Sequence, residues 1–112
     1  MENPETSSAW LELQMRRAEK VLERLGAVPL DLNRHNRDLL GQRVTYLLGT
    51  HYCRIDHAEF DGKPYLMLNA IEETKFAEIG LMEDIDAVPA EADDETLERE
   101  FRAALELPPA VD

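Results

Sequence analysis

Three residues near the middle of the chain have side chains that can bind metals or act as nucleophiles. His51, Cys53 and His57 alternate with other residues in a stretch that favours a strand, so they share one face of it. At ~3.3 Å per residue, His51 and His57 are about 20 Å apart along a strand, too far to share one ion. Only His51 and Cys53 can chelate together, and His35 is the obvious further ligand. The alternative is an ordinary buried thiol, with His57 satisfied on the core side of the strand.

The same thiol is a candidate nucleophile. A catalytic cysteine needs a nearby base and an electropositive setting that lowers its pKa. His57 is about 13 Å from Cys53 by strand rise, so only His35 or His51 could activate the thiol. A small enzyme or a metal-dependent protein that uses His35, His51 and Cys53 is therefore one function that the sequence leaves open.

No other catalytic or cofactor-binding motif is present in the sequence. The five glycines occur singly, so they form no glycine-rich phosphate loop. Asp84-Ile85-Asp86 and Asp93-Asp94 lack the glycine and the ligand spacing of a calcium loop. The many carboxylates follow no spacing that selects a catalytic pair. We therefore expect a protein that is not an enzyme and needs no cofactor.

The distribution of charge is the most informative feature of the chain. Its 112 residues include 24 acidic and 12 basic ones, which gives a formal net charge of −12. Residues 1–54 hold 7 acidic and 8 basic residues, whereas residues 55–112 hold 17 acidic and 4 basic ones. Such an excess repels phosphates, which argues against direct binding of nucleic acid, and it attracts basic proteins. The alternative is that the acidic half only keeps the surface well solvated.

Two sets of residues are candidates for binding a partner. Trp10 lies at the margin of an apolar helix face, and tryptophan is a typical interface anchor. Acidic residues of the last predicted helix could dock on a basic protein or imitate the phosphates of a nucleic acid: Glu91, Asp94, Glu95 and Glu98. We expect a non-enzymatic adaptor or regulatory protein whose acidic C-terminal half binds a protein partner of basic character. The first helix could also pair with its copy in a homodimer.

Three features of the sequence indicate the cellular compartment. No apolar run approaches the ~18–20 residues of a membrane span, so we expect no membrane insertion. The segment 1–5 is acidic and polar, unlike a signal peptide. Cys53 is the only cysteine, which excludes an intramolecular disulfide and fits a reducing compartment. These features predict a cytoplasmic protein.

The N-terminal part of the chain predicts a long helix. Asn3-Pro4 can begin it, with Ser7 or Ser8 as alternative caps, and Gly26 can end it. Its apolar residues recur with helical spacing: Leu11, Met15, Ala18, Val21, Leu22 and Leu25. Residues 27–42 are hard to assign. The leucines of 38–48 have helical spacing, but residues 43–48 favour a strand after a helical turn.

A β-hairpin is predicted in the middle of the chain. Asp61-Gly62 is a type I′ turn dipeptide between two runs of strand formers, 51–60 and 63–71. This turn pairs Phe60 with Lys63 and Cys53 with Ala70. The face toward the core then holds Cys53, Ile55, His57, Leu66, Leu68 and Ala70. The second face is amphipathic, and a helix or a partner chain could cover it.

The remaining residues complete an α+β fold. We expect a third strand at 76–82, a turn at 83–86, a linker at 89–94 and a final helix capped by Asp93 or Asp94. The predicted architecture is a long N-terminal helix packed on a small antiparallel sheet of three or four strands, followed by an acidic C-terminal helix. Residues 1–88 would form the globular domain. Residues 89–112 would be the linker and a helix that packs on this domain or extends from it.

Overall fold

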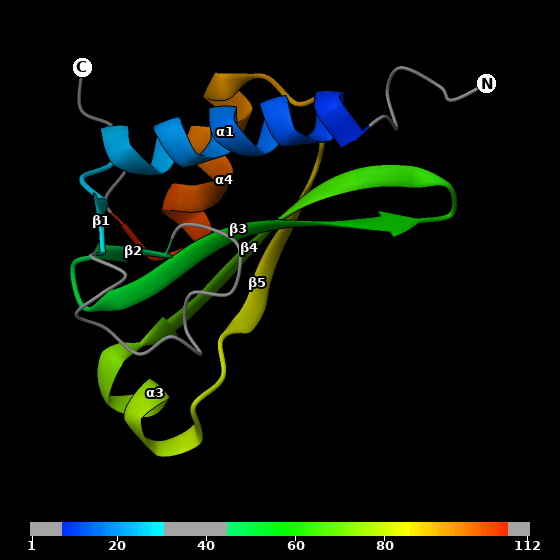
Figure 1. Ribbon diagram of the computed structural model, residues 1–112. Coiled ribbons are helices and arrows are strands. Elements are labelled where there is room, and N and C mark those ends of the chain that lie inside the picture. Colours follow the sequence, from blue (N-terminus) through cyan, green and yellow to red (C-terminus); the bar gives the residue numbers. More distant parts are fainter. Residues whose placement is uncertain (1–7, 31–44, 108–112) are drawn as a thin grey trace.

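A computed structural model describes residues 8–30 and 45–107 and confirms the α+β class (Figure 1). Along the chain, one long helix is followed by four strands of the sheet, a short helix, the fifth strand and a final helix. Neighbouring strands are antiparallel, and their order in the sheet is their order in the sequence, β1-β2-β3-β4-β5. The sheet therefore has five strands rather than the three or four that we expected.

The first helix, α1, spans Ser8–Arg24 and has the predicted apolar face. Met15, Ala18, Val21 and Leu22 are buried in the core, because the helical period places them on one side. Gly26 ends the helix with a positive φ of 109°, a conformation that only glycine adopts easily. The caps proposed at residues 3 and 7 lie outside the described residues.

The central hairpin has the register that its turn predicts. Strands β3 (His51–Phe60) and β4 (Lys63–Glu72) pair Phe60 with Lys63 and Cys53 with Ala70. The expected core residues are buried, with one exception. His57 is exposed because β2 pairs only with residues 51–54 of β3, which leaves His57 at an open edge among the described strands, whereas its partner Leu66 lies between β3 and β5. Its predicted place in the core is wrong.

Two short strands extend the sheet on the side of β3. Strand β2 (Thr45–Leu48) pairs with β3, which confirms a strand for this part of 43–48. Strand β1 (Val28–Pro29) pairs with β2 and forms one edge of the sheet. The helical turn expected before residue 43, and His35, lie outside the described residues.

The segment 73–82 differs from its prediction. Helix α3 (Glu73–Ile79) replaces the expected strand at 76–82. The carboxylate of Glu72 caps this helix by accepting the N–H of Lys75 at 3.4 Å, and Gly80 ends it with a φ of 72°. Phe76 then packs on the second sheet face, where its ring meets Tyr52 edge to face at 5.5 Å. A helix therefore covers part of this face.

The strand after the hairpin is β5 (Glu83–Pro89), which pairs with β4 through a register shift at Leu68/Asn69. Residues 83–86 were expected to form a turn, but they lie within this strand. Acidic residues are poor strand formers, yet an edge strand exposes them to solvent and tolerates them. The amide of Asn69 donates to the carboxylate of Asp84 and helps to hold the strand.

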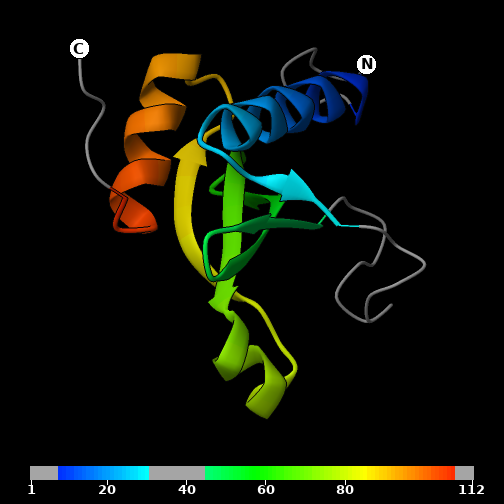
Figure 2. The same ribbon diagram turned by 90° about the vertical axis from the view of Figure 1, so that its left-hand side faces the viewer.

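The last helix, α4, spans Asp94–Ala104 and packs beside α1 on the same face of the sheet (Figure 2). Asp93 caps it, as predicted, by accepting the N–H of Thr96 at 2.8 Å. Leu97 and Phe101 are fully buried in the core that α1, β3 and β4 also line. Of the expected linker at 89–94, Pro89 ends β5 and Asp94 begins α4. Ala90 between them is fully buried, and its N–H donates to the carbonyl of Pro64 at 3.1 Å.

Candidate partner-binding site

The thiol of Cys53 belongs to the core. The residue is fully buried, and burial raises the pKa of its thiol to about 12. Sγ donates a weak hydrogen bond of 3.9 Å to the carbonyl of His51 on the same strand. A thiol with this pKa carries almost no thiolate at neutral pH. The geometry therefore gives Cys53 the ordinary packing role rather than that of a nucleophile.

His51 is half-buried at the beginning of β3, where its Nδ1 lies 3.5 Å from the hydroxyl of Thr50. Within residues 8–30 and 45–107, no group of three or more His, Cys, Asp and Glu side chains has a metal-binding arrangement. His35 lies outside these ranges. The set His35, His51 and Cys53 is therefore not assembled in the part of the chain that the structure describes.

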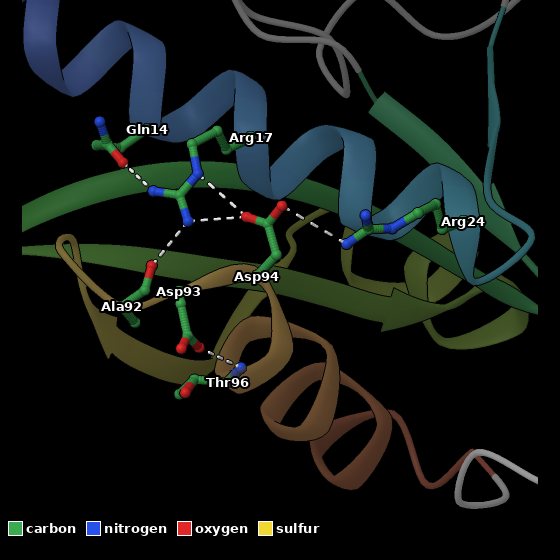
Figure 3. A network of polar contacts seen from close by, with 7 residues as sticks. All are labelled: Gln14, Arg17, Arg24, Ala92, Asp93, Asp94 and Thr96. Atoms are coloured by element: carbon green, nitrogen blue, oxygen red, sulfur yellow. Dashed lines mark hydrogen bonds and ion pairs between the residues drawn. The ribbon is translucent and has the colours of Figure 1, made fainter. Parts of the chain in front are cut away.

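The N-terminal end of α4 is fixed to α1 by a polar network (Figure 3). The guanidinium of Arg17 donates to Asp94 Oδ1 through Nε at 3.1 Å and through Nη2 at 2.8 Å. It also donates to the carbonyl of Ala92 at 2.9 Å and to the side-chain oxygen of Gln14. Arg24 approaches the other carboxylate oxygen of Asp94 at 3.9 Å. Asp94, a predicted partner-binding residue, is thus already paired within the molecule.

The other acidic candidates differ in their surroundings. Glu91, in the turn before α4, and Glu95, in its first turn, are exposed. Neither makes an ion pair with a described residue. Glu98 is half-buried and lies 3.5 Å from Arg102, one turn further along the helix. Glu91 and Glu95 are therefore the two predicted residues that remain accessible and uncompensated.

Further carboxylates extend this acidic surface along the molecule. Helix α4 runs beside β5, and β5 leads back to α3 at the far end (Figure 2). We call this surface the acidic side and define it by nine carboxylates from α3, β5, the turn before α4 and α4 itself, leaving out Asp94 because Arg17 pairs with it: Glu73, Glu78, Glu83, Asp84, Asp86, Glu91, Glu95, Glu98 and Glu100. Residues 72–100 contain only two basic residues, Lys75 and Arg99. The amine of Lys75 already lies 3.5 Å from the carboxylate of Glu83.

The carboxyl of Asp86 is affected both by burial and by a neighbouring carboxylate. Burial raises the pKa of its carboxyl, and the nearby carboxylate of Glu100 raises it further, while the N–H of Ala87 works in the opposite direction. One carboxylate oxygen of Asp86 accepts this N–H at 2.9 Å, and the other is buried without a hydrogen-bond partner among the described residues. The negative charge between β5 and α4 is therefore only partly compensated inside the protein.

A pocket of about 200 Å³ opens where the end of α4 meets β4, β5 and α3. Its apolar lining includes Ala70, Ile71 and Leu105, all of which are buried. Its polar lining consists of His51, Glu72, Lys75, Glu83 and Glu106. Hydrogen bonds from Thr74 and Lys75 lower the pKa of Glu72, so its carboxylate is charged at neutral pH. The polar lining therefore has three carboxylates against one lysine and one histidine.

Exposed apolar residues lie next to these charges. Ile79 and Leu81, on either side of Gly80, are 47% and 70% exposed, and Ile85 at the pocket is 37% exposed. Sequence reasoning missed them, because it assigned Ile79 and Leu81 to a sheet strand at 76–82 and Ile85 to a turn at 83–86. Gly80, a residue that often ends helices, was the signal that could have identified a helix before Leu81.

Trp10 is half-buried and packs against the main core. The N-terminal end of α1, which carries it, lies at the opposite end of the molecule from α3 (Figures 1 and 2). The structure therefore does not join Trp10 to the α3 end of the acidic side. The apolar residues of α1 pack in the core with those of the sheet, and the pairing of this helix with a second copy stays a prediction.

Comparisons of the chain with protein-family models, with curated proteins and with solved structures found no match. Among the described residues, no helix combines the length and the apolar character that crossing a membrane requires.

Proposed function

We propose that this protein is a cytoplasmic, non-enzymatic adaptor or regulatory protein that binds a basic protein partner through its acidic side. The observation that supports this most is a surplus of carboxylates without ion-pair partners among the described residues. These carboxylates are Glu73, Glu78, Glu91, Glu95 and Glu100. Residues 72–100 hold only two basic residues, and Lys75, one of them, already pairs with Glu83, so most of this surplus is available to an external cation.

Electrostatic considerations favour a basic partner. The carboxyl of Asp86 has a raised pKa because of burial and of Glu100, so its charge is unfavourable in the free protein. A cationic surface placed along β5 and α4 would lower the free energy of this arrangement. Such a surface would also increase the rate at which the two proteins associate, because the negative potential of one attracts the positive potential of the other.

The apolar residues beside the acidic side give the proposed interface a contact area that charge alone lacks. Interfaces commonly have an apolar centre inside a polar rim. Ile79, Leu81 and Ile85 would supply the apolar part, and Glu78, Glu83 and Asp84 lie close to them in the sequence. A partner of this kind would combine basic and apolar side chains.

The alternative function, an enzyme or metal-dependent protein that uses His35, His51 and Cys53, gains no support from this geometry. The thiol is enclosed in the core with a pKa of about 12. We therefore favour a protein that binds a partner over an enzyme or a metal-dependent protein.

A titration with a cationic probe tests the proposal. We would measure the fluorescence anisotropy of labelled octalysine with the full chain at about 0.05 M and about 0.5 M salt, because higher salt screens surface charges. Glu95→Lys should weaken binding at low salt by about fivefold, as expected for an exposed charge pair that is lost and replaced by repulsion. Glu59→Lys, on the hairpin, changes the net charge equally and is the matched control. Equal weakening by both substitutions would contradict the proposal.

A further inference from the structure

The pocket at the end of α4 differs from the rest of the acidic side because it has an apolar floor. Ala70, Ile71 and Leu105 are 2%, 3% and 8% exposed, so the floor is made of core residues rather than mobile surface chains. Drug-sized ligands occupy pockets of about 300–1,000 Å³. A pocket of about 200 Å³ is suited to something smaller, such as one side chain of a partner protein.

The charges around this floor favour a cation. Glu72, Glu83 and Glu106 line the pocket together with Lys75 and His51. Lys75 lies 3.5 Å from Glu83 and compensates one carboxylate, while hydrogen bonds keep Glu72 ionised. The carbonyl end of α4, which also adjoins the pocket, adds negative potential. A cation entering the pocket would therefore meet more negative charge than positive charge.

We propose that this pocket receives an arginine side chain of the basic partner. This inference rests on the proposed function, because it names the group that anchors the partner to the acidic side. The guanidinium would pair with the carboxylate of Glu106, which makes no ion pair with a described residue, and the methylene stem would lie on the apolar floor beside Ile85 and Leu105. Arginine fits better than lysine, since its planar guanidinium can make two parallel hydrogen bonds to one carboxylate. It is also more weakly hydrated than the ammonium group of lysine.

The position of Glu106 allows a test that does not endanger the fold. Glu106 follows the end of α4 with a φ of 57°, in the left-handed region that favours glycine. Glu106→Gly therefore removes the carboxylate while relieving backbone strain, and we expect its thermal midpoint to be at least that of the wild type. Glu106→Gln removes only the charge and serves as the conservative companion variant.

The experiment compares two labelled octapeptides, octalysine and the same peptide with one central arginine. The wild type should bind the arginine peptide about fivefold more tightly, because one charge-assisted contact is gained. In Glu106→Gly and in Glu106→Gln this preference should fall to less than about twofold, with little change in octalysine binding. Amide signals of residues 105 and 106 should shift only with the arginine peptide.

The outcomes separate this inference from the proposed function. Equal affinity of the wild type for both peptides, or a preference that survives both Glu106 substitutions, would overturn the arginine site while the acidic side remains a binding surface. If neither peptide binds, or if Glu59→Lys weakens octalysine binding as much as Glu95→Lys does, the proposed function fails and the arginine site fails with it.

Discussion

Arg17 connects the two long helices, and its removal should destabilise the fold measurably. In Arg17→Ala, Asp94 loses two hydrogen bonds from one guanidinium, and the carbonyl of Ala92 loses its donor. The side chain of Gln14, a residue only 5% exposed, also loses the donor of its oxygen. A half-exposed ion pair contributes about 0.2–1 kcal/mol, and a buried acceptor left without a partner costs about 1–3 kcal/mol. We therefore expect the free energy of unfolding to fall by about 2 kcal/mol.

Urea unfolding followed by circular dichroism measures this change. Arg16→Ala is the matched control, because the side chain of Arg16 is 68% exposed and pairs with Glu12 at 3.3 Å within the same helix. The control should lose less than about 0.5 kcal/mol. A double-mutant cycle with Asp94→Ala should give a coupling of about 0.5–1 kcal/mol between Arg17 and Asp94. An Arg17→Ala protein as stable as the control, or a coupling of zero, would refute the assigned role of this network.

Three further predictions concern single side chains. Asp86→Asn should raise the stability at neutral pH by less than about 1 kcal/mol, and the gain should vanish below about pH 4, because a raised pKa makes the ionised form the unfavourable one. Asp93→Ala should lower the urea midpoint at neutral pH, and this deficit should shrink on acidification, since the hydrogen bonds from Thr96 lower the pKa of Asp93. A thiol reagent should label Cys53 only after unfolding, and rapid labelling of the native protein would contradict its burial.

Local signals in the sequence were sufficient for much of the fold. The Asp61-Gly62 turn determines which residues of β3 and β4 face each other, because a two-residue loop leaves one register. The helical period of α1 and the cap at Asp93 are also local, and both are present in the structure. Helix α3 was missed although its ending glycine is visible in the sequence. The strand preference assigned to 76–82 was given more weight than this signal.

The remaining features depend on contacts between distant parts of the chain. Strand β5 contains three acidic residues, Glu83, Asp84 and Asp86, which disfavour a strand, and it forms by pairing with the edge of β4. Asp94 was expected to face a partner, but Arg17 lies 77 positions away in the sequence and binds it. The pocket combines residues from β3, β4, α3, β5 and the end of α4. No spacing rule along the chain could have assembled these groups.

The most direct test of the proposed function is to map where a basic peptide binds. In a titration of the isotope-labelled chain with octalysine, amide signals of α3, β5 and α4 should shift at low salt and return at about 0.5 M salt. Signals of the hairpin turn and of the N-terminal end of α1 should stay unchanged. Shifts concentrated around Trp10 or the hairpin, or no shifts at low salt, would contradict the proposal that the acidic side binds a basic partner.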